Sequence, residues 1–259
     1  MGTIILADSY DYDVVNTIGE HADMPATMLA AQQPRDIHQS TTADATLQID
    51  LGQAMAPDLI ALLYTNAGPD ATWEIRAAAT QGGLATGTVI KASGPFRNGT
   101  VIREDGRAHG LAHLTAPPAY RWWQVKVLGG TVPGGLLQLG RLIIGPAFQP
   151  TWNMGWKADY RYIKTGSGTQ LSSGAFIPAP SGACRGFQTK LSYLTEDEAW
   201  TDYYALSERA VGRAVLMIPD MDHDYVQRQL IYGVLDVGQP TFRKMLNEYQ
   251  TTINIREMV

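Results

Sequence analysis

The sequence contains a single cysteine, Cys184, among its 259 residues. One thiol cannot form an intramolecular disulfide, so the fold does not depend on oxidative cross-links and suits synthesis in a reducing cytoplasm. Pro, Ser, Gly and Ala surround Cys184, and no candidate base stands beside it. We therefore expect a small structural residue there rather than a nucleophile.

Charge is scarce as well. Only 17% of the residues are charged, against roughly 25% in ordinary soluble domains, and the net charge is −5. No cluster of Lys and Arg exceeds two residues in a row, so the basic patch that a phosphate backbone requires is missing. We expect no nucleic-acid partner, and a weakly charged surface suits a protein that packs against other subunits.

Long apolar runs are absent. The segments Leu59–Leu63 and Ala214–Ile218 are far shorter than the roughly 20 residues of a membrane-spanning helix. The first residues form no cationic segment, and the apolar stretch that they contain is only as long as a strand. We expect neither a signal peptide nor membrane insertion.

Motifs of the common catalytic sites are also missing. The sequence has no G-x-S-x-G, H-E-x-x-H, C-x-x-C or G-x-G-x-x-G pattern, and such patterns place nucleophiles, metals or dinucleotides. The densest carboxylate group, Glu196–Glu198, is accounted for by the start of a helix. We expect no enzymatic activity, no catalytic residue and no cofactor.

What the sequence does contain is strand periodicity. Apolar and polar residues alternate in Thr46–Leu51, Thr72–Ala77 and Arg121–Val127, which is typical of half-buried strands. Leu59–Tyr64 is continuously apolar, as in a strand covered on both faces. Turn signals separate these segments, and Asn98-Gly99 favours a hairpin. The first half is therefore predicted to be a β-sandwich.

The second half combines strands with one helix. Thr195 is a suitable N-cap, and Glu198 completes a capping box, while Gly212 suits the C-terminal end. This predicts a helix over about residues 196–211, with one face formed by Trp200, Tyr203, Tyr204 and Val211. Strands are expected over 157–164, 185–194, 214–218, 227–235 and 251–258.

Gly-Pro and Pro signals near Gly145–Thr151 indicate a domain boundary. We predict a mainly β chain, with a sandwich over residues 1–145 and a β-rich domain with one α-helix over residues 146–259. Between the first strands of the second domain, Thr165–Thr169 superficially resembles a phosphate cradle. It lacks the lysine of such a loop and no amphipathic helix follows, so a hairpin tip is the preferred interpretation.

Three groups of residues are candidate metal ligands. Asp8, Asp11 and Asp13 form an acidic cluster that is a candidate calcium site, although a polar turn is the default. The group Asp220, Asp222 and Asp224 begins like a calcium loop, but the later ligands are missing, so a solvated turn is preferred. His109 and His113 are four residues apart, which on a strand separates them by about 13 Å, too far for one ion.

Aromatic residues are the candidates for ligand binding. Because Trp123 belongs to the apolar face of its strand, Trp122 should point to the opposite face. Aromatic rings stack on sugar rings, and they also occur frequently at protein interfaces. We name Trp122, Tyr10 and Tyr12 as candidate ligand-binding residues, with a covering loop or subunit as the alternative for Trp122.

Three stretches resemble discoidin-like (galactose-binding-like) domains: Leu47–Asn66, Ala71–Ala79 and Tyr120–Leu128. In these stretches Ile49-Asp50-Leu51-Gly52 matches one signature of that family and Arg121-Trp122-Trp123 another. The resemblance covers roughly residues 1–145 and implies a jelly-roll sandwich. It brings no loop motif for a sugar or lipid, so it does not by itself imply a ligand.

The second half resembles phage distal tail and tail-tube proteins. The stretch Leu136–Asn153 is similar to a junction in tail and baseplate proteins. The order of elements after it is similar too: a strand, the helix 196–211, a glycine with an apolar strand and Pro-Asp over 212–220, a strand over 231–235 and a terminal strand over 253–257. In those families the fold forms a sixfold ring that joins the tail tube to the baseplate. This chain departs from them in having its sandwich first.

Together these resemblances imply a virion structural protein of a phage tail tip or baseplate. Its partners would be the tail tube, the baseplate hub and copies of itself, in a homo-oligomer such as a hexamer. It would be soluble in the host cytoplasm before assembly and part of the virion afterwards. The alternative is a carbohydrate-binding or receptor-binding module that acts through the N-terminal sandwich on glycans.

Overall fold

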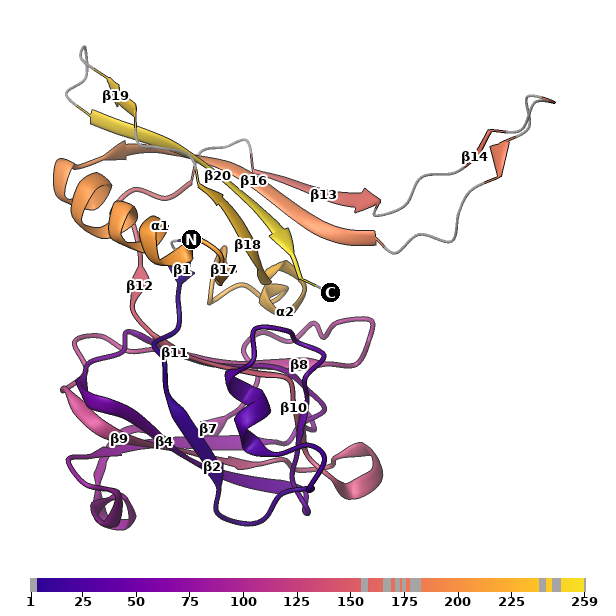
Figure 1. Ribbon diagram of the computed structural model, residues 1–259, viewed down its shortest axis with the longest axis vertical. Helices are drawn as coiled ribbons and strands as arrows, with labels where there is room; N and C mark the ends of the chain where they lie inside the picture. Colours follow the sequence, from indigo (N-terminus) through magenta and orange to yellow (C-terminus); the bar gives the residue numbers. More distant parts are fainter. Residues whose placement is uncertain are drawn as a thin grey trace. The chain divides into compact units, whose positions relative to one another are not determined.

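The computed structural model describes residues 4–154, 158–164, 169–170, 173, 176–177, 183–237, 241–243 and 248–258. The fold is mainly β, with antiparallel sheets and few helices (Figure 1). This confirms the predicted fold class.

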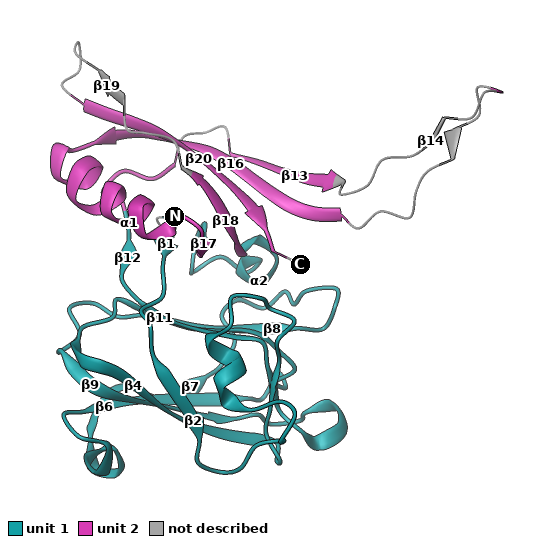
Figure 2. Cartoon of the chain, viewed as in Figure 1, with its two compact units in different colours: residues 1–149, 218–230 teal, residues 150–217, 231–259 magenta. Residues whose placement is uncertain are grey.

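The chain forms two compact units (Figure 2). Unit 1 consists of residues 1–149 and 218–230, and unit 2 of residues 150–217 and 231–259. The sequence placed everything after residue 146 in a second domain, whereas the segment 218–230 packs with unit 1. The reason is a buried glutamine in that segment, Gln227, whose side chain bonds to the backbone of unit 1.

Unit 1 contains a five-stranded antiparallel sheet. Its strands are, in spatial order, β2 (Asp13–Asn16), β4 (Asp44–Met55), β9 (Tyr120–Leu128), β6 (Thr72–Ala78) and β7 (Thr88–Pro95). Three of the predicted strands lie within β4, β6 and β9, and their apolar positions are the buried ones. Alternation therefore identified the inner face of this sheet correctly.

A three-stranded sheet lies in the same unit, with the order β11 (Arg141–Gly145), β5 (Leu59–Thr65) and β8 (Ala108–His113). Leu59–Leu63 is fully buried, as a strand covered on both faces should be. Short elements complete unit 1: β1 (Ile5–Ala7) paired with β12 (Ala147–Phe148), β3 (His38–Gln39) paired with β10 (Gln138–Leu139), and the 3₁₀ turns Ala26–Ala30, Gln81–Thr86 and Pro133–Gly135.

The core of unit 1 is one hydrophobic cluster to which both sheets contribute. Trp73 and Trp123 come from the five-stranded sheet, and Ile60, Leu62 and Leu142 from the three-stranded sheet. Removal of this apolar surface from water is the main term that stabilises such a sandwich. The expected sandwich is therefore present in the first half of the chain.

Unit 2 is built on an antiparallel sheet with the order β17 (Ala214–Ile218), β18 (Ile231–Val237), β20 (Glu248–Glu257), β16 (Ala183–Leu194) and β13 (Asp159–Lys164). The strand β19 (Thr241–Arg243) also pairs with β20, and β14 (Thr169–Gln170) pairs with β15 (Phe176–Ile177). Thr165–Gly168, which the sequence assigned to a hairpin tip, lies outside the described residues.

The helix of unit 2 begins with the predicted capping box. The Glu198 amide donates to Thr195 Oγ1 over 3.2 Å, and the Thr195 amide donates to Glu198 Oε2 over 2.8 Å. The other oxygen of Glu198 accepts a bond from the Thr151 amide over 2.6 Å. Burial alone would raise the pKa of Glu198, but these hydrogen bonds outweigh it and hold the pKa below its ordinary value.

The predicted aromatic face of this helix is wrong. Tyr203 is fully buried, whereas Trp200, Tyr204 and Val211 are exposed. The helix contains a π-helical turn, Glu198–Tyr203, before α1 (Tyr204–Ala210). A π-helical turn winds the chain more loosely than an α-helix, so positions projected at 3.6 residues per turn no longer share a face. Gly212 ends the helix with a φ of 75°, as predicted.

Two further local predictions need correction. Residues 227–230 were assigned to a strand but belong to a short helix, α2 (Val226–Gln229), and its end. Asn98-Gly99 does not form a hairpin, because β7 pairs with β6 and β8 pairs with β5. Gly99 has a φ of 70°, and a Cβ there would lie 2.6 Å from the carbonyl oxygen of Asp224. Its positive φ and its lack of a side chain therefore allow this loop to approach the loop that contains Asp224.

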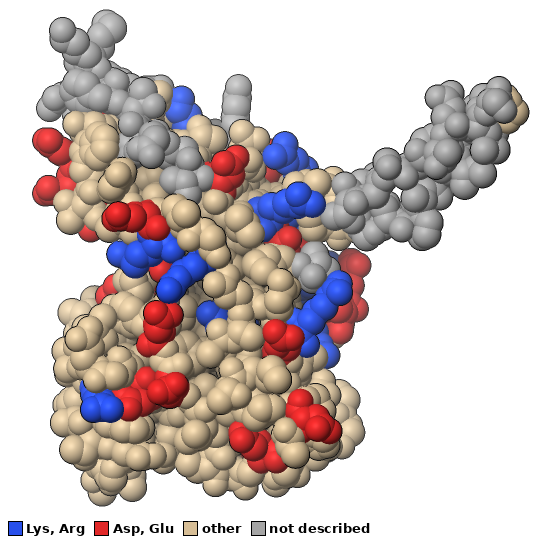
Figure 3. All heavy atoms as spheres, viewed as in Figure 1, with Lys and Arg blue, Asp and Glu red and all other residues tan. Residues whose placement is uncertain are grey.

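The described part of the chain has no helix long and apolar enough to cross a membrane. On the face drawn in Figure 3, acidic and basic side chains are interspersed and most of the surface carries no charge. This agrees with the low fraction of charged residues, 17%.

Candidate functional site

The candidate site is a cavity of unit 1, to which the edge strands of both sheets contribute. β7 is the last strand of the five-stranded sheet and β8 is the last strand of the three-stranded sheet. An edge strand has backbone groups without a strand partner on one side, so other segments must cover it. Here the covering segments are the loop after β7 and residues 218–230.

Gln227 attaches the segment 218–230 to β8. Its side-chain oxygen accepts a bond from the His109 amide over 2.7 Å, and its side-chain nitrogen donates to the His109 carbonyl over 2.8 Å. The same nitrogen donates to the carbonyl of Asn98 over 2.9 Å. Gln227 therefore bonds to the β8 backbone much as a neighbouring strand would, which positions Met221 and Asp222 of the same segment.

The loop after β7 is held by the same segment. The amides of Thr100 and Val101 donate to the Asp224 carbonyl over 3.2 and 3.1 Å, and Thr100 Oγ1 donates to Asp224 Oδ1 over 3.2 Å. Asn98 Oδ1 accepts a bond from the Leu111 amide of β8 over 3.1 Å. The loop after β7, the strand β8 and the segment 218–230 are thus joined at one place.

The resulting cavity has a volume of about 440 Å³. Its polar lining residues are Lys91, Asn98, His113, Gln149 and Asp222. Its apolar lining residues are Ile5, Ile90, Leu111, Ala112, Leu114 and Met221. The cavity is therefore lined both by hydrogen-bond donors and acceptors and by apolar side chains, which is the usual composition of a site for a small molecule.

The two histidines considered as metal ligands both lie on β8. His109 is fully buried and accepts a hydrogen bond on Nδ1 from the Tyr64 amide over 3.1 Å, whereas His113 is half-buried and lines the cavity. The strand conformation is the one that the sequence favoured over zinc binding. The role of His113 in a cavity was missed, because its cavity neighbours come from other parts of the chain.

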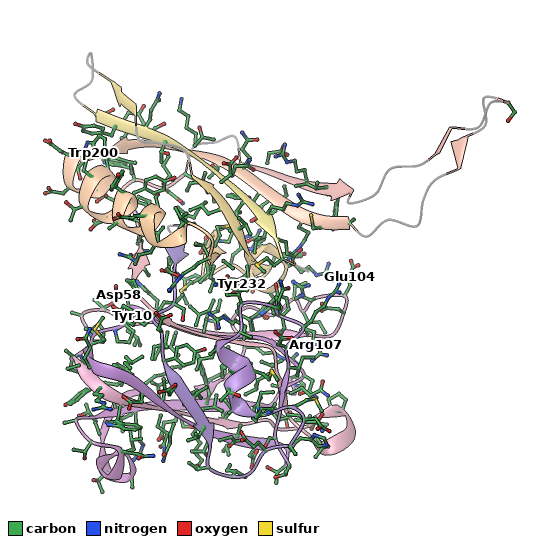
Figure 4. All side chains as sticks on the ribbon, in the orientation of Figure 1. Tyr10, Asp58, Glu104, Arg107, Trp200 and Tyr232 are labelled. Atoms are coloured by element: carbon green, nitrogen blue, oxygen red, sulfur yellow. The ribbon has the colours of Figure 1, made fainter. Side chains whose placement is uncertain are left out.

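The structure does not place the predicted ligand-binding aromatics in this cavity. Tyr12 Oη lies 2.7 Å from the carbonyl oxygens of both Leu29 and Leu142. Its hydroxyl is therefore used within the fold. Tyr10, labelled in Figure 4, packs with Tyr12 against the hydrophobic core of unit 1.

Trp122 lies on the face of β9 opposite Trp123, as alternation predicted. Trp123 is fully buried and Trp122 is partly exposed. The guanidinium of Arg121 lies 5.5 Å from the Trp122 ring and donates two 2.7 Å bonds to Asp50. These hydrogen bonds from Arg121 hold the pKa of Asp50 below its ordinary value.

The acidic clusters do not form a cation site in the described structure. Asp8 is buried and accepts a bond from the Ser9 amide over 2.7 Å, while Asp11 and Asp13 are exposed. Asp220 accepts a bond from the Asp222 amide over 3.0 Å, as in a polar turn. Among the described residues, no three His, Cys, Asp or Glu side chains are grouped to hold a metal ion.

Several solved structures similar to this chain are carbohydrate-binding modules. CBM32-1 from a family 31 glycoside hydrolase of Clostridium perfringens is 16% identical, with a TM-score of 0.40, over 52% of this chain and 94% of that chain. The family 32 module of C. perfringens NanJ, in complex with galactose, is 16% identical with a TM-score of 0.40, over 54% and 98%. The CBM32 of AlyQ, in complex with 4,5-unsaturated mannuronic acid, is 14% identical with a TM-score of 0.39, over 54% and 96%.

No protein-family model and no curated protein matches the chain. At these identities and TM-scores the similarity to solved structures carries no argument about a ligand.

Proposed function

We propose that unit 1 is a non-catalytic carbohydrate-binding module and that the cavity lined by β7, β8 and residues 221–222 is its saccharide site. The observation that carries the proposal is the convergence of five polar side chains over an apolar floor in a cavity of about 440 Å³. That volume lies within the range of about 300–1,000 Å³ for small-molecule sites.

The chemistry of the lining favours a neutral, hydroxylated ligand. Lys91 only donates hydrogen bonds and ionised Asp222 only accepts them, while Asn98 and Gln149 do both. Sugar hydroxyls are donors and acceptors at once, so they match this mixture. One ammonium and one carboxylate also leave the cavity without a large net charge, and Leu111 and Met221 offer apolar surface to sugar C–H groups.

The test is a glycan array on the full chain followed by titration calorimetry with the sugars retained, galactose included. Lys91→Met and His113→Leu should each weaken binding about tenfold, as expected for loss of one hydrogen bond of about 1.4 kcal/mol. Lys126→Met is the matched control, because Lys126 is an exposed lysine of β9 outside the cavity. It should bind as the wild type does.

Two results would contradict this proposal. One is an array on which no sugar is retained. The other is full binding by Lys91→Met and His113→Leu together with loss of binding by Trp122→Ala. That outcome would locate the sugar on the outer face of the five-stranded sheet instead.

As a second candidate we propose assembly into a ring of a phage-type tail, with the tail tube and baseplate hub as partners and the virion as its location. The observation that favours it is an aromatic cluster on unit 2. Trp200 and Tyr204 are 46% and 40% exposed, and the Trp200 ring lies 5.8 Å from that of Tyr204 and 6.0 Å from that of Tyr249 (Figure 4). Exposed aromatic rings are enriched in subunit interfaces.

Size-exclusion chromatography with light scattering tests the assembly. The full chain should elute as a species of several subunits, and Trp200→Ser with Tyr204→Ser should shift it to the monomer. Tyr225→Ser, which changes a tyrosine of unit 1 that is 48% exposed, should leave the oligomer intact. A wild-type chain that stays monomeric at high concentration, without binding to tube or hub proteins, excludes the ring.

A further inference from the structure

Unit 2 carries two arginines on either side of a glycine on one face of its sheet. Gly186 of β16 pairs with Arg256 of β20 and, on its other side, with Arg161 of β13. Val234 of β18 pairs with Arg256 and extends the same row. Residues in one row point to the same face, and neighbouring strands are about 4.8 Å apart. The two arginine side chains therefore flank a position that has no side chain.

In the part of the chain that the structure describes, each of the two guanidinium groups forms one hydrogen bond and has further N–H groups that a ligand can bind. Arg161 Nη2 donates to Asn254 Oδ1 over 3.3 Å, and Arg256 Nε lies 3.3 Å from Cys184 Sγ. Among the described residues, neither arginine forms an ion pair with a carboxylate. The nearby Glu257 instead accepts a 2.8 Å bond from Arg185 Nε.

A cavity of about 500 Å³ lies over this row. Besides the two arginines, Asp236, Asn254 and Glu257 line it, and Asn254 Nδ2 donates to Asp236 Oδ2 over 3.3 Å. Its apolar lining comes from Ile163, Val234 and Met258. The Ile163 side chain packs over Gly186, since a Cβ there would lie 2.8 Å from Ile163 Cδ1.

We propose that this cavity is a second binding site, separate from the cavity of unit 1, and that it takes the carboxylate of an acidic saccharide. A guanidinium matches a carboxylate with two parallel hydrogen bonds. Asp236 and Asn254 can bond the hydroxyl groups of the same ligand, and Val234 and Ile163 can contact its C–H groups. A bare phosphate would use only the arginines, whereas a sugar acid also supplies hydroxyl groups that Asp236 and Asn254 can bond.

Titration calorimetry on the full chain with D-glucuronate, D-glucose and inorganic phosphate tests the site. Glucuronate should bind, glucose should bind much more weakly at this site, and phosphate should not compete with glucuronate. Arg161→Gln and Arg256→Gln should each weaken glucuronate binding about tenfold or more, as expected for the loss of a charge-assisted hydrogen bond. Lys190→Gln is the matched control, because Lys190 is an exposed cation of β16 outside the cavity.

The site is excluded if glucuronate fails to bind, or if Arg161→Gln and Arg256→Gln bind it as well as Lys190→Gln does. If phosphate competes with glucuronate at equal strength, the two arginines bind inorganic anions in general, and the proposal of a saccharide ligand is wrong. Lys91→Met in unit 1 separates the two sites: it should leave glucuronate binding unchanged. If only the unit 1 proposal is wrong, the chain will not bind neutral sugars. Glucuronate binding and its dependence on Arg161 and Arg256 will then be unchanged.

Discussion

Gln227→Leu is expected to lower the free energy of unfolding by about 4 kcal/mol, because it removes three hydrogen bonds and leaves buried backbone groups without a partner. The side chain of Gln227 is 1% exposed and bonds to both backbone groups of His109 and to the carbonyl of Asn98. Leucine keeps the apolar part of the side chain but cannot replace these bonds. Urea denaturation of the full chain measures the change.

The same substitution should also weaken sugar binding at the unit 1 cavity. Met221 and Asp222 line the cavity and belong to the segment that Gln227 attaches to β8. Gln32→Ala, at an exposed glutamine of unit 1, should change neither stability nor binding. Wild-type stability in Gln227→Leu would mean that the segment 218–230 is held by other contacts.

Trp123→Ala should destabilise unit 1 by about 4 kcal/mol, as large-to-small substitutions of buried aromatic residues do. Trp123 is fully buried in the core of the sandwich, and its indole N–H donates to the Tyr120 carbonyl over 3.0 Å. Alanine would leave a cavity between the two sheets that the surrounding side chains can fill only in part. The midpoint of urea denaturation, followed by tryptophan fluorescence and circular dichroism, reports the loss.

Trp122→Ala is the matched comparison, because the two tryptophans are adjacent in sequence and lie on opposite faces of β9. It should cost about 1 kcal/mol, since the side chain is partly exposed and packs beside Arg121. Equal destabilisation by both substitutions would show that the outer face of the sheet is as closely packed as the core. A stable Trp123→Ala variant would contradict the sandwich itself.

The strands that the sequence predicted well are those with strict alternation. Over Thr46–Leu51, Thr72–Ala77 and Trp123–Val127 of β4, β6 and β9, each residue's exposure follows from its position along its own strand, because successive side chains point to opposite faces. The capping box of Thr195 and Glu198 was predictable for a similar reason, since its hydrogen bonds join residues three positions apart. The helix face was not, because the π-helical turn changes the spacing on which the projection depends.

Turn residues were a weaker guide. Asn98-Gly99 was assigned to a hairpin because Gly99 was expected to have a positive φ, and it does. That conformation instead allows the loop to approach the backbone of Asp224. The conformation of a residue is a local property, whereas the partner that requires it lies elsewhere in the chain. Residues 227–230 were misassigned for the same reason: Gln227 is buried by its bonds to β8 and Asn98, not by a strand.

The sequence by itself determined that the chain is mainly β, where most strands lie, and that one glycine-terminated helix follows Thr195. These properties depend on interactions between residues a few positions apart. Only the tertiary structure decided which side chains converge in a cavity. Gln227 and His109 are 118 positions apart, and such a contact depends on how edge strands and loops pack, which no local pattern encodes.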